Sequence, residues 1–277
     1  MEKWKEFYNE EQIKNVQAIE KELLLEFIRI CDELKLEYVL YGGTLLGYEK
    51  YRGFIPWDDD VDVALPRESN DQFVELAETI IGEQYCIQTP QKCKHSPYPY
   101  TKLRKKGTHF VEYHNRKLNI EDGIYIDIYP IDKIPDDEIL RRKQFKRVRL
   151  WIKIYVCRQS RLYDKKEEGL LGKCKNLLRY VECTVPKIFP QKYCVKKIEH
   201  FMTMYNRDSC KRYAALNSPN FDNIYTDLYP LEKGEFEGIN VTLPGNYRDH
   251  LKRRYGDYSE LPPEEERFGH VPYRLEY

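Results

Sequence analysis

The sequence has 277 residues, of which 46 are Lys or Arg and 46 are Asp or Glu, so its formal charge is zero although 33% of the residues are charged. This length suits one large domain or a domain with a sizeable insertion. A mean hydropathy of −0.74 and the lack of any apolar run near the ~18–20 residues that span a bilayer exclude an integral membrane protein. The N-terminal residues are charged and contain no apolar signal core, so we expect a cytoplasmic chain.

Cysteine spacing argues against both disulfides and a thiolate zinc site. A domain of this size does not depend on disulfides, and no C-x-x-C pair is present among the eight cysteines. We therefore expect reduced thiols that pack in the core, at positions 31, 86, 93, 157, 174, 183, 194 and 210.

The N-terminal third begins with a predicted helix and a predicted strand. Apolar residues recur at helical spacing over 13–34 and predict an amphipathic helix that ends near Lys35. The run 38–41 has strand composition and leads into Gly42-Gly43-Thr44, after which Leu45 begins a short helix. Glycines at such a junction let backbone N–H groups and a helix N-terminus approach a phosphate closely.

The most specific chemistry lies in the acidic run that follows. We predict a strand over 58–65, in which Asp58, Asp60 and Asp62 share one face while the apolar residues at 61, 63 and 65 point into the core. Converging carboxylates repel one another unless a cation neutralises them, and oxygen ligands favour Mg²⁺ or Mn²⁺. An EF-hand calcium loop does not fit, because Val63 and Ser69 stand where its Gly and Glu are needed.

Later elements extend this pattern. We predict a helix over 68–81 and a β-rich run over 123–129 that ends at Pro130. Asp127 lies in that run between two isoleucines, where a carboxylate is costly to bury unless it is paired or bound to metal. Strands and helices mixed without a repeat predict an α+β or α/β fold, with a phosphate cradle that faces a metal site.

The middle of the chain is a separate basic module. Residues 136–212 contain 21 Lys or Arg and 9 Asp or Glu, whereas the rest of the chain contains 25 and 37. Apolar residues at helical spacing over 139–156, proline breaks at 186 and 190, and a second helical stretch over 194–205 predict a helical insertion. Its cations are interleaved with Phe145, Trp151 and Tyr155 and either dock on an anionic membrane surface or stay solvated while these apolar residues pack on the core.

Three motifs together resemble the LicD family, which shares its catalytic core with the fukutin-type transferases. They are Gly-Gly-Thr-Leu-Leu-Gly at 42–47, Gly-Phe-Ile-Pro-Trp-Asp-Asp-Asp-Val-Asp at 53–62 and Ile-Asp-Ile-Tyr-Pro-Ile-Asp at 126–132. The C-terminal stretch 243–270, with Tyr-Gly-Asp-Tyr at 255–258, is similar to the closing motif of the family. The resemblance covers about residues 12 to 271 and matches the helical insertion only loosely.

The resemblance implies an α+β fold with a nucleotidyltransferase-like mixed β-sheet core, flanking helices and a basic helical insertion. The expected boundaries are 1–135 for the catalytic core, 136–212 for the insertion and 213–277 for a C-terminal part that completes the core. It also implies a phosphotransferase that moves phosphocholine from CDP-choline to a sugar hydroxyl of a teichoic acid, lipopolysaccharide or capsule precursor. Transfer of ribitol, glycerol or ethanolamine phosphate, and a nucleotidyltransferase that uses an NTP, remain alternatives.

The site residues implied by position fall into two groups. Asp60, Asp62 and Asp127 would be catalytic and would bind Mg²⁺ (or Mn²⁺). Substrate contacts are expected from the glycine turn and from charged residues elsewhere, namely Gly42, Gly43, Thr44, Lys50, Asp58, Lys102, Arg104 and His270.

Two departures from the family pattern concern the donor contacts. Lys50 stands where the family often has Arg, and Val271 follows His270 where a second His is common. The expected partners are a CDP-alcohol donor and a lipid-linked glycan acceptor, with peripheral contact at the inner face of the membrane and no nucleic acid.

Overall fold

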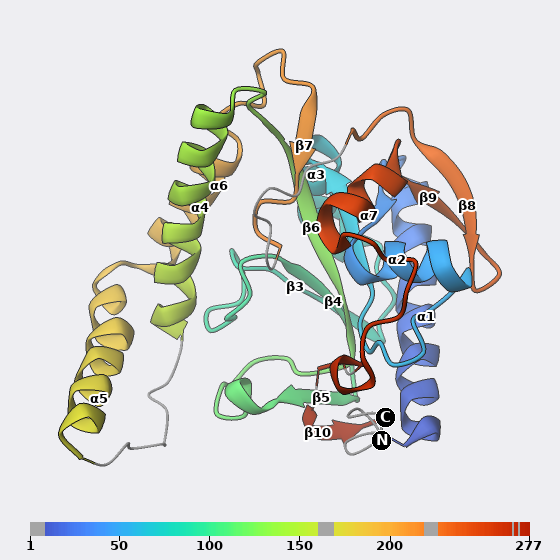
Figure 1. The fold of residues 1–277 in the computed structure, drawn as a ribbon. Coiled ribbons are helices and arrows are strands. Elements are labelled where there is room, and N and C mark those ends of the chain that lie inside the picture. Colours follow the sequence, from blue (N-terminus) through green and yellow to red (C-terminus); the bar gives the residue numbers. More distant parts are fainter. Residues whose placement is uncertain (1–8, 160–168, 219–226, 268, 271) are drawn as a thin grey trace.

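The computed structural model describes residues 9–159, 169–218, 227–267, 269–270 and 272–277, and it has the expected α+β architecture. Its centre is a mixed sheet in the order β1-β2-β6-β4-β3, with β7 added to the far end of β6 (Figure 1). Only β2 and β6 run parallel to each other, and the remaining pairs are antiparallel. The strands are β1 (Val39–Leu40), β2 (Asp62–Pro66), β3 (Tyr85–Gln88), β4 (Thr101–Lys105), β6 (Tyr125–Ile134) and β7 (Arg212–Ala214).

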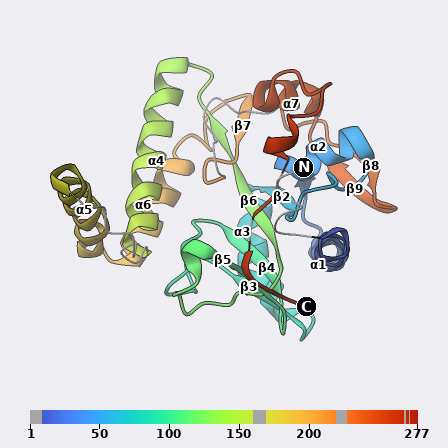
Figure 2. The same ribbon diagram turned by 60° about the horizontal axis from the view of Figure 1, so that its bottom comes forward.

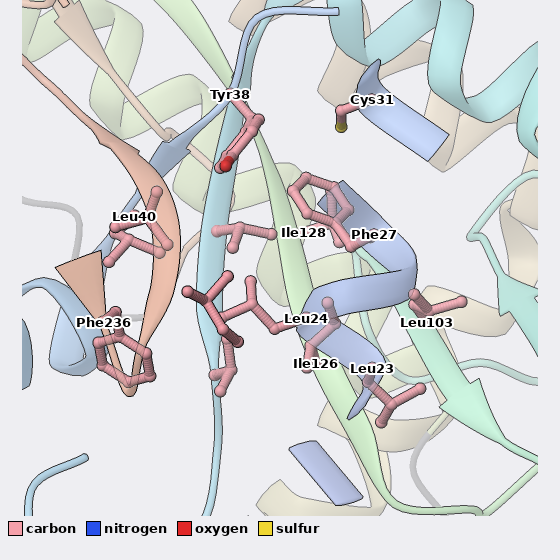
Figure 3. Close-up of a cluster of buried hydrophobic side chains, with 14 of the residues drawn as sticks. Leu23, Leu24, Phe27, Cys31, Tyr38, Leu40, Leu103, Ile126, Ile128 and Phe236 are labelled. Carbon is pink, nitrogen blue, oxygen red and sulfur yellow. The ribbon is translucent and has the colours of Figure 1, made fainter. Parts of the chain in front are cut away.

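One face of this sheet is covered by α1 (Glu10–Leu34) and α3 (Arg67–Leu76). The predicted amphipathic helix is confirmed: Asn9 and Gln12 form a capping box at its start, and Lys35 ends it in a left-handed conformation with φ 55°. Apolar side chains of α1 pack against alternate residues of β4 and β6 (Figure 3). The labelled contacts of this core include Leu23, Leu24, Phe27, Leu103, Ile126 and Ile128.

The acidic strand starts later than the sequence predicts. Only Asp62–Pro66 forms β2, because its antiparallel partner β1 has two residues and the chain then turns into α2 (Gly42–Tyr51). Asp58 instead lies at a turn, where its N–H donates to the Ile55 carbonyl at 2.9 Å. The prediction that Val61, Val63 and Leu65 point into the core is confirmed, since all three are fully buried there.

Strand β6 is longer than predicted and runs through Pro130. Pairing with β4 ends at Ile128 and pairing with β7 begins at Asp132, so Pro130 lies between the two partners. The backbone N–H of Asp127 faces β2, where it donates to the Val61 carbonyl at 2.8 Å. By alternation, the missing N–H of Pro130 lies on the other side, where no strand requires a donor. The helix predicted over 68–81 is α3, which ends at Leu76 and continues as the 3-10 turn η2 (Ala77–Thr79).

Between β6 and β7 the chain is helical, as predicted for the insertion. The elements are α4 (Glu138–Gln159), α5 (Gly169–Thr184), the 3-10 turn η4 (Val185–Ile188) and α6 (Gln191–Met202). Helices α4 and α6 pack on each other and on the β6–β7 end of the sheet through a second apolar cluster. Figures 1 and 2 both place these helices to one side of the sheet, with α5 farthest from it.

The C-terminal part returns to the core. It contributes β7, a hairpin of β8 (Glu232–Phe236) and β9 (Ile239–Leu243), and helix α7 (Tyr247–Tyr255). The 3-10 turn η5 (Glu264–Glu266) precedes β10 (Pro272–Glu276), which pairs with β5 (His109–Glu112), and η3 (Tyr113–Asn115) follows β5. Across the described residues no helix is long and apolar enough to cross a membrane. The seven cysteines whose side chains are described are free thiols.

Candidate active site

Three charged side chains form a row across the centre of the sheet. In the strand register, Asp62 of β2 lies beside Asp127 of β6, and Asp127 lies beside Lys102 of β4. Their sequence neighbours Val63 and Leu103 point to the α1 face, so the row lies on the opposite face. The alternation that builds the core therefore also gathers these charges.

Asp60 joins this row from the loop before β2. Single carboxylate oxygens of Asp60, Asp62 and Asp127 all lie within 4.8 Å of one another. Burial raises the pKa of Asp62 to about 8, and the charges of Asp60 and Asp127 add to that shift. Burial likewise raises the pKa of Asp60 to about 6, because it outweighs the charge of His270, which acts to lower that pKa. Three converging carboxylates that repel one another are a donor set suited to a hard divalent cation.

The ammonium group of Lys102 is enclosed by Asp127 and aromatic rings. Its Nζ donates to Asp127 Oδ1 at 2.5 Å, and Tyr129 Oη donates to the other oxygen at 3.2 Å. The same ammonium lies 3.3 Å from the ring centre of Tyr125 and 4.2 Å from that of Tyr98. Burial lowers the pKa of Lys102, and the pairing with Asp127 acts against that shift. Ring faces and one carboxylate thus replace the water that this cation loses.

The glycine turn holds Asp62. Gly42 has φ +52°, and a Cβ there would lie 1.8 Å from Asp62 Oδ2, so only glycine fits. The N–H of Gly43 donates to the same oxygen at 3.2 Å, and Thr44 Oγ1 accepts the N–H of Asp62 at 2.8 Å. The predicted phosphate turn is therefore the N-terminus of α2, and it fixes the position of the acidic strand.

These groups line a cavity of about 220 Å³. Arg254 reaches it from α7, and its Nη1 is buried without a hydrogen-bond partner among the described residues. Its Nε donates to Tyr255 Oη at 3.0 Å. A buried guanidinium donor with spare capacity beside Asp62 is suited to an anion. The described lining consists of Tyr41, Gly43, Asp60, Asp62, Tyr98, Tyr100, Lys102, Glu112, Tyr125, Asp127, Tyr129, Ser218, Arg254 and His270.

His270 ties the C-terminal segment to the acidic loop. Asp59 Oδ1 accepts the backbone N–H of His270 at 2.8 Å and lies 3.2 Å from its Nδ1. The same ring nitrogen is 3.8 Å from Asp60. Burial acts to lower the pKa of His270, but Asp59 and Asp60 outweigh it and raise that pKa well above its ordinary value. Asp59, Asp60 and His270 form a second group that is compact enough for a cation.

Five of the eight expected substrate contacts do not line this cavity, namely Gly42 and Thr44, which contact Asp62, and three charged residues. Lys50 donates to the carbonyls of Tyr258 and Ser259 at 2.6 and 3.0 Å, outside the cavity lining. Arg104 lines a neighbouring cavity of about 200 Å³ and donates to Gln88 and to the Gly123 carbonyl. Asp58 is packed against Gly43, because a Cβ added to Gly43 would lie 2.9 Å from Oδ2 of Asp58. The structure therefore gives these three residues structural contacts rather than a place in the cavity.

Other lining residues escaped prediction from the sequence. Five of the 24 tyrosines face the cavity, and nothing in their spacing distinguishes them. Glu112 reaches it only because β5 pairs with β10, near the end of the chain. Arg254 directly precedes the Tyr-Gly-Asp-Tyr motif, and this position was the one available signal.

Comparison with known proteins finds similarity over the part of the chain that contains the charged row. Residues 35–156 match the family model described as LicD/FKTN/FKRP, nucleotidyltransferase domain. This part of the chain is similar to the LicD family. This match contains the acidic loop, β2, β4 and β6, and hence all members of the charged row.

Two curated relatives are similar to this chain over different lengths. One is the lipopolysaccharide cholinephosphotransferase LicD of Haemophilus influenzae, which is 26% identical over 266 residues, or 93% of this chain and 95% of that protein. The other is an uncharacterised protein of Rickettsia typhi, 26% identical over 141 residues, or 49% of this chain and 43% of that protein.

Proposed function

We propose that this chain is a metal-dependent transferase that moves phosphocholine from CDP-choline to a sugar hydroxyl of a cell-surface glycan precursor. The observation that carries the proposal is the meeting of three carboxylates with Lys102 and Arg254 in one cavity. Similarity to the cholinephosphotransferase of Haemophilus influenzae over nearly the whole chain supports phosphocholine as the transferred group. The proposed acceptor is a lipid-linked lipopolysaccharide, capsule or teichoic acid precursor, with the protein in peripheral contact with the membrane.

The proposed metal ligands are Asp60, Asp62 and Asp127, and the proposed ion is Mg²⁺ (or Mn²⁺). The donor set fits, because it consists of carboxylate oxygens within 4.8 Å of one another. When bound, such an ion supplies positive charge that stabilises the negative charge growing on the phosphate oxygens.

In the proposed reaction, the acceptor hydroxyl oxygen attacks the phosphorus that bears choline, and the bond from that phosphorus to the CMP oxygen breaks. The hydroxyl proton passes to a carboxylate of the cavity. Lys102 and the spare donor of Arg254 contact the donor phosphates, as charge-assisted hydrogen bonds to phosphate are strong. Asp127 is held between Lys102 and Tyr129, so its carboxylate is fixed before substrate arrives.

Aromatic rings of the cavity support choline over an uncharged alcohol. Lys102 already occupies faces of Tyr98 and Tyr125, whereas Tyr41 and Tyr129 also line the cavity with ring centres 6.0 Å apart. A quaternary ammonium binds to such faces through cation–π attraction, which glycerol and ribitol lack.

The decisive experiment incubates the protein and Mg²⁺ with CDP-choline, CDP-ethanolamine, CDP-glycerol, CDP-ribitol or CTP, together with a glycan acceptor. We expect CMP release and a phosphocholine mass increase on the acceptor with CDP-choline. The Asp62→Asn variant, which retains the shape of the side chain, serves as the control and should release no CMP. Preferred use of another CDP-alcohol would contradict the donor assignment, and pyrophosphate release from CTP would indicate a nucleotidyltransferase instead.

A further inference from the structure

An apolar stripe is exposed along α5 and η4. Its members are Leu177, Leu178, Val181, Val185 and Ile188, with exposed fractions of 63, 65, 45, 49 and 76%. After the adjacent Leu177 and Leu178, steps of three and four residues place them along one side of α5 and η4. Within the described part of the chain, this side is exposed. We call these five residues the apolar stripe.

Exposed lysines accompany the apolar stripe, and the described acids of α5 and α6 are paired. Glu182 of α5 forms an ion pair with Lys153 at 3.1 Å, and Glu199 of α6 forms one with Arg67 at 2.6 Å. The exposed lysines of α5, η4 and α6 are Lys173, Lys175, Lys187, Lys192 and Lys196. The elements α5, η4 and α6 therefore combine an exposed apolar stripe with exposed lysines.

The aromatic residues expected at a membrane surface are not available there. Tyr155 and Phe145 are 0 and 5% exposed in the second apolar cluster, so that prediction is wrong for both side chains. Trp151 packs edge-on against Phe189 and Tyr193, with ring centres 5.6 and 5.5 Å apart. These three aromatic residues therefore serve in packing, although Ile139, Leu140 and Leu150 of α4 are exposed. Helix α5 lies at the outer end of the insertion in both views (Figures 1 and 2).

We propose that the apolar stripe and its flanking lysines dock the protein on an anionic lipid bilayer. The stripe enters the boundary between headgroups and acyl chains, and the lysines contact the anionic headgroups, as in interfacial amphipathic helices. Charge complementarity selects this occupant. The insertion carries 21 basic and 9 acidic residues, so a second copy of the same surface is repelled, whereas an anionic bilayer attracts it. This proposal rests on the proposed function for the membrane contact and names the surface that makes it, which contains none of the proposed catalytic residues.

The first experiment is sedimentation of the full chain with vesicles of phosphatidylcholine and phosphatidylglycerol in equal parts, and with phosphatidylcholine alone. We expect binding to the anionic vesicles that weakens as salt shortens the Debye length. Absence of binding at low salt, or equal binding to both vesicles, overturns the proposal.

Matched variants identify the surface. Leu178→Ser with Ile188→Ser, and separately Lys187→Glu with Lys192→Glu, should each lower the ratio of bound to free protein at least about tenfold. Leu25→Ser on α1, whose side chain is 48% exposed, is the control and should bind like the unaltered protein. Unchanged binding of both double variants overturns the assignment of this surface.

Two readouts separate docking from other effects. Tryptophan at position 188 (Ile188→Trp) should be quenched by lipids that carry a quencher in the upper acyl chain, and lack of quenching contradicts insertion. Concentration-dependent self-association that the Ile188→Ser change removes, without vesicle binding, would indicate a second copy instead and overturn the proposal. Transfer to a water-soluble acceptor should be equal in all these variants, so failure of docking and failure of the proposed transferase activity remain distinguishable.

Discussion

Removing the positive charge of Lys102 should destabilise the protein strongly. Lys102 and Asp127 form a buried ion pair with side-chain exposures of 1 and 6%. Lys102→Met keeps the length of the side chain but leaves Asp127 beside Asp60 and Asp62 without its cation. Breaking a buried pair on one side costs about 3–5 kcal/mol. At roughly 2–4 °C per kcal/mol, the melting midpoint should fall by roughly 6–20 °C.

The reverse change should cost less. In Asp127→Asn the ammonium of Lys102 retains the ring faces of Tyr125 and Tyr98, at 3.3 and 4.2 Å, and the amide oxygen can still accept its hydrogen bond. We therefore expect a loss of about 1–3 kcal/mol. Combining Lys102→Met with Asp127→Asn should be more stable than Lys102→Met alone, because no unpaired carboxylate remains at position 127.

The assay is urea and thermal unfolding of metal-free protein at neutral pH. Lys105→Met is the matched control, since Lys105 lies on the same strand in a pair with Glu22 whose side-chain exposures are 23 and 41%. That exposed pair should contribute at most about 1 kcal/mol. If Mg²⁺ binds the three carboxylates, adding it should restore part of the stability of Lys102→Met. A Lys102→Met variant as stable as the control, or less affected than Asp127→Asn, would refute the reasoning.

Three further predictions concern single side chains. Asp62→Asn should abolish transfer while circular dichroism and the melting midpoint stay within a few degrees of the unaltered protein, and near-normal turnover at saturating Mg²⁺ would exclude its metal role. Arg254→Gln should raise the donor KM and lower kcat/KM by about 10–100-fold, as expected for charge-assisted hydrogen bonds; Arg254→Lys should recover part of this, and an unchanged KM would contradict phosphate contact. Arg67→Met removes the two hydrogen bonds, at 2.8 and 2.5 Å, that the fully buried Asp132 carboxylate accepts from Arg67 and leaves only the neutral donor Asn206 among the described residues, so urea unfolding should report a loss of about 3–5 kcal/mol, and a change below the error of the measurement would refute it.

Local pattern in the sequence was sufficient for much of the fold. Helical spacing over 13–34 predicts α1, because its buried side must meet the sheet at every third or fourth residue. Alternation over 61–65 predicts which side chains of β2 enter the core. Strand ends were harder to predict, because they depend on where the neighbouring strand begins and ends. The short β1 leaves 58–61 without a partner on the β1 side, and a gap between β4 and β7 lets β6 continue through Pro130.

The sequence also determined the chemical character of the site. Asp60, Asp62 and Asp127 were identified from acidic residues beside apolar strand residues, where an unpaired carboxylate is too costly to bury. The two glycines that begin α2 were predicted to let a phosphate approach the backbone closely, whereas the group that approaches Gly42 in the structure is the carboxylate of Asp62. These inferences rest on residue type and on neighbours along the chain.

Only the tertiary structure decided which distant residues complete the site. Lys102 belongs to it because β4 pairs with β6 in one register, and Arg104, two residues away on the same face, is bound to Gln88 beside a neighbouring cavity. Arg254 enters through the packing of α7, while Lys50 is held by backbone carbonyls near the end of the chain. In the sequence, all four positions simply carry a positively charged side chain. Whether it faces a carboxylate, a ring or water depends on strand register and helix packing, which are set by contacts between residues far apart in the chain.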